Sequence, residues 1–288
     1  MISDITLGQY FPGNSILHKL DPRSKLIITV LFITAVFLAN SPLAFFILFL
    51  TTMTLVGVSK ISYKVIFKGI KPIVFVLIFT ALINVFMTKG ESEPLVDFWI
   101  IRIYQEGIIR AFFMGFRVVL LIIGTSVLLT YTTSPISLTD GIENLFSPLK
   151  KIKVPVHVFA MMMTIALRFI PTLIEETEKI MNAQKSRGAD FSSGSLAKRA
   201  KALIPLLVPL FVSSFKRADE LATAMECRCY RGDKNRTKLI KLSYKAIDYI
   251  SMFAGALFLG LMVVLSLRPN SLLEIIPDAV KSVIFYKI

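Results

Sequence analysis

The sequence is poor in the residues that water-soluble enzymes and metalloproteins depend on. Only 18% of its 288 residues are charged, and it contains just 2 Cys, 2 His and 1 Trp. Soluble domains carry about 25% charged residues, so this composition does not suit a water-soluble enzyme. So few Cys and His side chains also exclude a disulfide-rich scaffold and argue against a metal cage built from these ligands.

Hydrophobic residues make up 55% of the chain, with 23 Phe and 11 Met. This excess suits a protein that uses lipid as part of its solvent. The 33 Lys and Arg outnumber the 19 Asp and Glu and give a net charge of +14. In a soluble protein such a charge suggests nucleic-acid binding, whereas in a membrane protein it reflects basic cytoplasmic loops. We therefore expect the lipid bilayer as a partner, and no nucleic acid.

Long apolar runs predict an all-α membrane protein with about five transmembrane helices. The first run turns at Asn40-Ser41-Pro42, which divides it into Leu26–Ala39 and Leu43–Val58. Each half is shorter than the roughly 20 residues that cross a bilayer, so the number of membrane helices in residues 22–58 stays open. The other predicted membrane segments are Pro72–Thr88, Ile108–Tyr131 and Ala246–Leu267.

Charges between these segments predict the topology. Residues 59–71 carry four Lys and no acid, whereas residues 89–107 carry four acidic and two basic residues. Residues 132–245 hold 19 Lys and Arg against 10 Asp and Glu. By the positive-inside rule, the N-terminus, residues 59–71 and residues 132–245 lie in the cytoplasm, and residues 89–107 lie outside.

This topology divides the chain into three parts. Residues 1–131 form N-terminal transmembrane helices, 132–245 form a cytoplasmic helical unit, and 246–288 form the last transmembrane helix and a tail. The role of the tail, residues 269–288, stays open.

The cytoplasmic unit contains two apolar pieces of its own, Val154–Ile174 and Leu203–Phe215. A membrane hairpin built from them would place a strongly basic loop outside, against the charge rule. We favour long helices that lie along or below the membrane face and are apolar on one side. Lipid and a partner protein would cover that side.

Motifs for nucleotide or metal chemistry are lacking. Gly8 and Gly13 have the spacing of an ATP-binding loop, but Asn14-Ser15 follows where Lys-Ser or Lys-Thr is required. Cys227 and Cys229 flank one Arg without a nearby His, which is weak support for a metal site. We expect no catalytic residue, no metal ligand and no cofactor.

We expect the isolated polar residues within apolar stretches to stabilise the fold rather than to carry chemistry. We expect His157 to be a packing histidine with its polar atoms satisfied, and Arg117, deep in a membrane segment, to pair across the helix bundle. Only Asp248, at one edge, is acidic within the best membrane segments, whereas secondary transporters usually need intramembrane carboxylates.

Two places in residues 132–245 look alike: Ser186-Arg187-Gly188 and Cys227-Arg228-Cys229. Each places an Arg between small residues at the end of a long helical run. Helical spacing puts each Arg on the same face as apolar residues four and seven positions earlier: Ala183, Ile180, Ala224 and Leu221.

A guanidinium at such a helix end can form forked hydrogen bonds inside a groove of a partner. Two such ends predict two grooves, and hence two similar partner subunits. The alternative is that Arg is simply favoured at helix C-termini by the helix dipole.

The sequence resembles the transmembrane T component of energy-coupling factor (ECF) transporters, the EcfT group related to CbiQ, over nearly its whole length. Leu20-Asp21-Pro22-Arg23-Ser24-Lys25 resembles the family's L-D-P-R-x-K entry motif. Leu167-Arg168-Phe169-Ile170-Pro171 and the two X-Arg-X sites follow in the family's order. Ser186 and Cys227 replace the Ala that is common in the family, but both are small, so docking should survive.

The resemblance implies a complex with a substrate-binding membrane S subunit and two ABC ATPase subunits. The ATPase-docking residues would be Ser186, Arg187, Gly188, Cys227, Arg228 and Cys229. A first, shorter coupling helix would cover Ser137–Lys150. ATP-driven movement of the two long coupling helices, with bends at their prolines, would reorient the S subunit and release a vitamin or other micronutrient inward. The protein would lie in the cell membrane, with its coupling helices in the cytoplasm.

The sequence names neither the vitamin or metal transported nor the ATPase that meets each Arg. Two other functions stay open. A stand-alone secondary carrier or channel would need a polar route, for which Asn84, Arg117 and Thr125-Ser126 are the candidates. A membrane enzyme acting on lipid headgroups would depend on Glu175 or Glu176.

Overall fold

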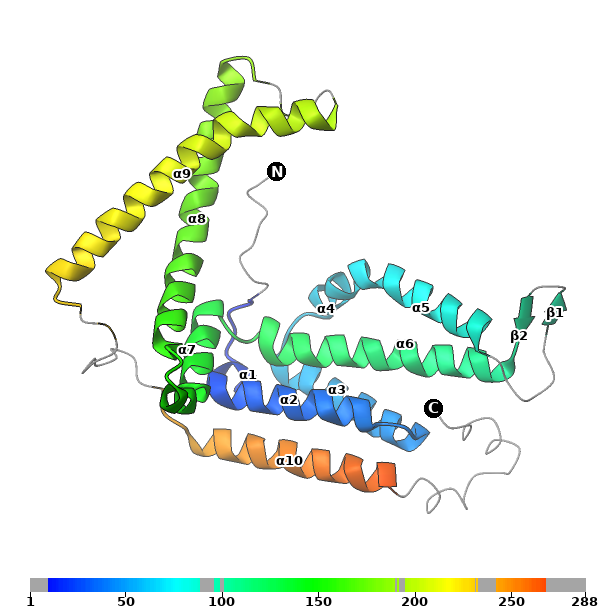
Figure 1. The fold of residues 1–288 in the computed structure, drawn as a ribbon. Coiled ribbons are helices and arrows are strands. Elements are labelled where there is room, and N and C mark those ends of the chain that lie inside the picture. The colour runs from blue at the N-terminus through cyan, green and yellow to red at the C-terminus, as the bar shows by residue number, and fades with distance from the viewer. Residues whose placement is uncertain are drawn as a thin grey trace. The chain divides into compact units, whose positions relative to one another are not determined.

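A computed structural model of the chain describes residues 10–88, 96–98, 101–189, 191, 195–230, 232 and 242–267. Two compact units can be separated. One is built from the described residues within 142–241, and the other from those within 9–141 and 242–288. Helices account for nearly all the regular structure, which confirms the predicted all-α class (Figure 1).

The unit formed by residues 9–141 and 242–288 begins with α1 (Ile16–Lys19), α2 (Pro22–Leu38) and α3 (Pro42–Ser59). The predicted break between the last two is confirmed: the Ser41 side chain accepts a hydrogen bond from the Ala44 N–H at 3.2 Å, and Pro42 opens α3. Such a polar cap followed by proline is a strong helix start. The 17 residues of α2 span about 26 Å, less than the hydrocarbon core of about 30 Å.

The next membrane segment begins earlier than Pro72, where the sequence placed it. It consists of α4 (Tyr63–Ile70), a 3₁₀ turn (Lys71–Ile73) and α5 (Val74–Met87). Pro72 lies in the 3₁₀ turn between α4 and α5, and because proline has no N–H to donate to a carbonyl four residues earlier, it favours the break in the α-helix at this point. In α4, Lys64 and Lys68 are exposed, whereas Ile66 is buried. The basic residues thus lie on the outer side of a helix.

A short antiparallel hairpin follows, which the sequence did not predict. Strands β1 (Val96–Phe98) and β2 (Ile101–Ile103) pair with Val96 opposite Ile103. The chain then enters α6 (Gln105–Thr125), which continues through a π-helical turn (Ser126–Thr130).

The last helix of this unit, α10 (Ala246–Leu267), has the bounds that the sequence predicted. It lies alongside α2, and α5 lies alongside α6 (Figure 1). Gly124 of α6 allows α2 to come close, because a Cβ there would clash with the Phe32 ring. The buried core between these helices includes Phe32, Val36, Leu48, Leu128 and Met262.

Arg117 pairs across this bundle, as predicted. Its Nη2 donates to the Ala39 carbonyl at 2.6 Å and to the Asn40 Oδ1 at 3.3 Å, and its guanidinium lies 5.3 Å from the Phe45 ring centroid. The last carbonyls of a helix have no partner within the helix. Arg117 therefore closes the C-terminal end of α2 at the turn into α3.

The other unit contains two long helices, α8 (Val156–Ser186) and α9 (Leu196–Cys227). Before them in the sequence come α7 (Pro135–Leu145), which crosses the boundary between the two units, and a 3₁₀ turn (Ser147–Ile152). The helix implied at Ser137–Lys150 therefore begins earlier, at Pro135, and ends at Leu145. Pro148 favours this end of α7, because proline has no N–H to donate to the carbonyl four residues earlier and its ring crowds that carbonyl. His157 is buried, with its Nδ1 3.0 Å from the Glu143 Oε1, which confirms a packing histidine.

Among the residues that the structure describes, five helical segments are long and apolar enough to cross a membrane: Pro42–Ser59, Tyr63–Met87, Gly107–Thr130, Val156–Ser186 and Ala246–Leu267. Their number agrees with the prediction, but α8 takes the place of the shorter α2. The assignment of residues 132–245 to the cytoplasm therefore stays a prediction that rests on the charge pattern. The tail at 269–288 lies outside the described residues.

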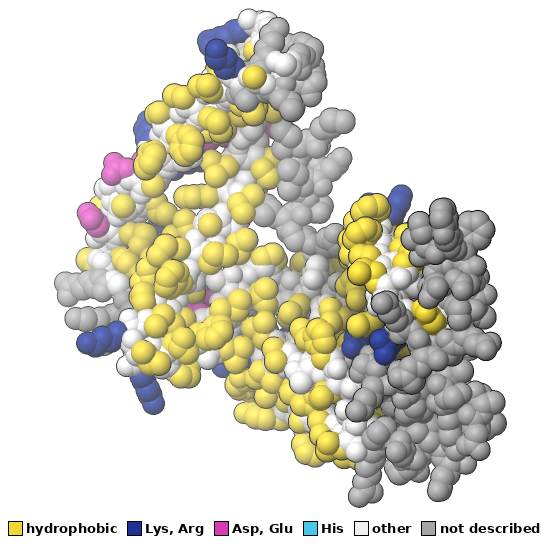
Figure 2. Space-filling view, turned by 45° about the vertical axis from the view of Figure 1, so that its right-hand side comes forward, with side chains coloured by type: hydrophobic (Ala, Val, Ile, Leu, Met, Phe, Trp, Pro, Cys, Tyr) yellow, Lys and Arg dark blue, Asp and Glu magenta, His cyan; other side chains and the backbone are white. Residues whose placement is uncertain are grey.

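Hydrophobic side chains cover most of the described surface in the view of Figure 2. On α5, Phe75 is 78% exposed, and on α9, Phe215 is 74% exposed. Continuous apolar surface of this kind requires lipid or protein to cover it.

Candidate functional site

The two long helices end in the same way, and each end is built around an arginine. Arg187 is the C-cap of α8 with φ −88° and ψ 8°, and Arg228 is the C-cap of α9 with φ −90° and ψ 15°. The following residue is left-handed in both, with φ 87° at Gly188 and 57° at Cys229. The two arginines therefore occupy equivalent backbone positions.

At the end of α8, two backbone hydrogen bonds define this cap. The Gly188 N–H donates to the Lys185 carbonyl at 2.9 Å, and the Ala189 N–H donates to the Gln184 carbonyl at 3.0 Å. This pair of bonds is the Schellman motif, which satisfies the last carbonyls of a helix.

The end of α9 repeats the pattern. The Cys229 N–H donates to the Glu226 carbonyl at 2.8 Å, and the Tyr230 N–H donates to the Met225 carbonyl at 3.0 Å. Glycine normally fills the left-handed position, as Gly188 does, whereas a side chain there costs roughly 1–2 kcal/mol. The Schellman motif at Cys229 was therefore not readable from the sequence.

All six predicted docking residues lie exposed at these two caps: Ser186, Arg187, Gly188, Cys227, Arg228 and Cys229. Ile180 and Leu221, seven residues before the arginines, are half-buried, whereas Ala183 and Ala224 are exposed. The structure thus groups the residues into two similar tips, each a guanidinium between small neighbours. Their contact with ATPases stays a prediction.

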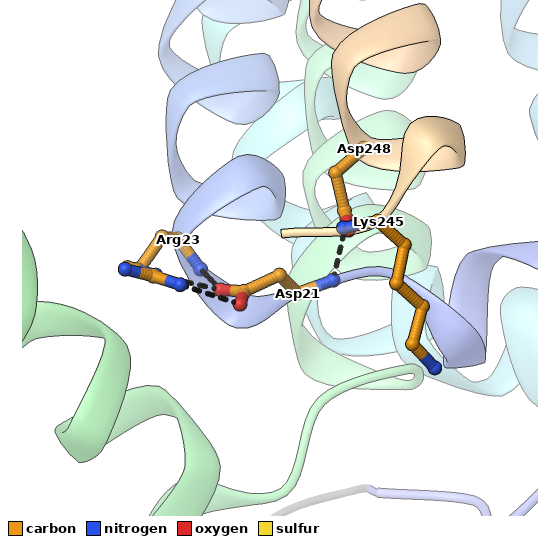
Figure 3. Close-up of polar contacts among 4 residues, drawn as sticks. All are labelled: Asp21, Arg23, Lys245 and Asp248. Carbon is orange, nitrogen blue, oxygen red and sulfur yellow. Dashed lines mark hydrogen bonds and ion pairs between the residues drawn. The ribbon is translucent and has the colours of Figure 1, made fainter. Parts of the chain in front are cut away.

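The entry motif near the N-terminus has a structural role (Figure 3). Asp21 caps α2 by accepting from the Arg23 N–H at 2.9 Å, and its Oδ2 pairs with the Arg23 Nη2 at 2.9 Å. Burial acts to raise the pKa of Asp21, but the hydrogen bonds and positive charge of Arg23 outweigh it and hold the pKa below its ordinary value. The Arg23 guanidinium also lies 3.9 Å from the Tyr244 ring centroid.

Asp248 links the start of α10 to this motif. Its Oδ1 accepts from the Asp21 N–H at 2.7 Å, and its Oδ2 accepts from the Lys245 N–H at 2.8 Å (Figure 3). The residue is only 1% exposed. From the sequence, Asp248 is only an acid at the edge of a segment; that it is a single acid in a 22-residue apolar helix is the one sign of this role.

Lys25, the last residue of the motif, contacts the segment that follows α6 and its π-helical turn. Its Nζ donates to the Thr132 carbonyl at 2.7 Å and to the Thr133 Oγ1 at 3.1 Å, and the residue is 2% exposed. The entry motif therefore joins the start of α2 to both α10 and the segment that follows α6.

Comparison with known proteins decides the family. Residues 13–239 match the CbiQ family model, described as cobalt transport protein. The chain belongs to the CbiQ family. Its family membership and its five apolar helices make it a multi-pass protein of the cell membrane.

Several CbiQ relatives are named energy-coupling factor transporter transmembrane protein EcfT. The chain is 55% identical to the one from Clostridium kluyveri over 251 residues, which cover 87% of this chain and 93% of the relative. It is 50% identical to that of Acidaminococcus fermentans over 266 residues, covering 92% and 97%. Identity to the Bacillus subtilis protein is 48% over 248 residues, covering 86% and 93%. These matches confirm the family resemblance seen in the motifs.

Proposed function

We propose that the chain is the transmembrane energy-coupling subunit of an ECF-type importer for a vitamin or another micronutrient. The observation that carries this function is the pair of long helices that end in equivalent, exposed arginine caps. Its close similarity to proteins named EcfT supports the same function. In this proposal the chain is not an enzyme, because ATP hydrolysis belongs to two partner ABC ATPases.

In the complex, each arginine cap enters a groove of one ATPase. The small neighbours of Arg187 and Arg228 let the helix end approach closely, and the guanidinium supplies a fork of hydrogen bonds to carboxylate or carbonyl oxygens. The apolar surface of α8 and α9 is the part that an S subunit and lipid would cover. Movement of the ATPases on ATP binding and hydrolysis would then move the helices and reorient the S subunit.

A stand-alone carrier or channel is the second candidate, but polar residues proposed to line its route form hydrogen bonds with backbone carbonyls instead. Asn84 Nδ2 donates to the Thr80 carbonyl at 2.8 Å, and Thr125 Oγ1 donates to the Leu121 carbonyl at 2.7 Å, each within its own helix. Arg117 is bonded to the end of α2. These groups therefore do not support a hydrated route through the described helices.

Vesicle transport separates the two functions. The chain would be reconstituted alone, with an S subunit of its source organism, and with that S subunit and both ABC ATPases, and uptake of the vitamin bound by the S subunit would be measured. We expect ATP-dependent uptake only with the complete set. Uptake by the chain alone, without ATPases, would establish the stand-alone carrier instead.

A further inference from the structure

A polar cluster joins the two long helices to each other within their described residues, and it has no part in the function proposed above. Glu176 of α8 accepts hydrogen bonds from two residues of α9 through different oxygens. Its Oε2 accepts from the Arg217 Nη2 at 2.8 Å, and its Oε1 accepts from the Ser213 Oγ. Ser213 and Arg217 are four residues apart, which places them on one face of α9, one turn from each other.

The position of this contact relative to the two arginine caps is symmetric. Arg187 comes eleven residues after Glu176, and Arg228 comes eleven residues after Arg217. At the rise of an α-helix, each cap lies about 16 Å beyond the contact. Figure 1 shows α8 and α9 crossing, with their C-terminal ends pointing apart. The two helices thus form equal arms on either side of one ion pair.

Prolines lie just before the contact in both helices. Pro171 is five residues before Glu176 in α8, and Pro209 is four residues before Ser213 in α9. A proline inside a helix removes a backbone hydrogen bond, so the helix bends most easily there. Each arm, from its proline to its arginine, is therefore a separate stretch of helix, and the Glu176 contact lies on both arms.

The ion pair is accessible enough to rearrange. The Glu176 side chain is 21% exposed and that of Arg217 is 38% exposed. Partly hydrated ion pairs tolerate rotation of their partners better than close apolar packing, because solvent can replace a lengthened hydrogen bond. Such a contact can hold two helices together while the angle between them changes.

We propose that Glu176, with Ser213 and Arg217, is the pivot of the two coupling helices. These positioning residues keep the arms joined, so that movement at the caps changes the crossing angle rather than separating the helices. This proposal rests on the coupling function above and names the contact that transmits the movement. Breaking the pivot would let the ATPases turn over without reorienting the S subunit.

The test uses the complete transporter in vesicles and measures ATP hydrolysis and vitamin uptake in the same sample. Glu176→Gln removes the charge and keeps the size of the side chain, and Glu175→Gln is a matched control at a neighbouring exposed residue. We expect Glu176→Gln to retain both ATPases and to hydrolyse ATP, with uptake per ATP reduced roughly fivefold or more. The control should match the unmodified protein.

The second part of the test exchanges the charges of Glu176 and Arg217. Glu176→Arg with Arg217→Glu restores the ion pair in the opposite sense, so uptake per ATP should recover relative to either single variant. Unchanged uptake per ATP in Glu176→Gln, or no recovery in the reversed pair, would overturn the pivot. Failure of the unmodified chain to retain ATPases would instead overturn the coupling function. If Glu176→Gln does not fold, Ser213→Ala and the reversed pair give the same readout.

Discussion

Uptake is expected to fall to background when the charge of both cap arginines is reversed, in the Arg187→Glu, Arg228→Glu chain, although the chain still folds. Both residues are exposed C-caps, and their backbone bonds do not depend on the side chain. Breaking one partner of a desolvated ion pair at an interface costs about 2–5 kcal/mol, so each cap should lose at least about 30-fold in affinity. Because the two caps act together, the double variant should lose more than either single one.

The helices themselves offer matched controls for this experiment. Lys179→Glu with Lys216→Glu makes the same change in net charge at exposed positions of α8 and α9, away from the caps. This control should take up the vitamin normally. Arg→Lys at either cap should give an intermediate loss, since lysine keeps the charge but not the planar fork. Normal uptake by the double charge-reversal variant would contradict the docking of these caps.

Asp248→Ala is expected to destabilise the chain more than other single substitutions of acidic residues. It leaves the buried Asp21 N–H and the partly buried Lys245 N–H without the acceptor that each now has. An unsatisfied buried donor such as the Asp21 N–H costs about 1–3 kcal/mol, and with the smaller loss at the Lys245 N–H this should lower the midpoint of thermal unfolding in detergent by about 5 °C or more. The contact between α2 and α10 should fail first.

Two further variants serve as controls for the loss of stability in Asp248→Ala. Asp248→Asn keeps one carbonyl oxygen as an acceptor and should lose less stability than the alanine variant. Asp219→Ala removes an exposed carboxylate from α9 and should leave the midpoint unchanged. If Asp248→Ala unfolds at the same temperature as the unmodified chain, Asp248 is not the link between α2 and α10.

Local signals in the sequence predicted much of this fold. The bounds of α10 followed from its uninterrupted apolar run, and the turn between α2 and α3 followed from Asn40-Ser41-Pro42. The helix α4 was not predicted, because its lysines are typical of a loop, and the sequence alone does not show that Ile66 is buried. The number of membrane helices in residues 22–58 stayed open because α2 is short, and the charge pattern, rather than length, kept α8 out of the predicted membrane segments.

The sequence likewise predicted some features of the candidate site and not others. The two arginines and their small neighbours were readable as a repeated local pattern. The sequence did not predict that the two helices end in the same backbone conformation, because Cys229 adopts a left-handed conformation that glycine usually adopts. The contacts of Asp248 with Asp21, and of Glu176 with Arg217, join residues far apart in the chain, and a single sequence does not show which residue is the partner of each.

The most direct test of ATPase docking uses the thiols beside Arg228. Cys227 and Cys229 are the only cysteines of the chain, and both are exposed. Their rate of reaction with a maleimide would be measured with and without the two bound ATPases. A second variant, Ser186→Cys with Cys227→Ser and Cys229→Ser, has its single cysteine beside Arg187 and is labelled in the same way. We predict that bound ATPases slow labelling at both caps, and that Arg→Glu at a cap restores the fast rate there. Equal labelling rates with and without ATPases that are shown to be bound would contradict docking at these arginines.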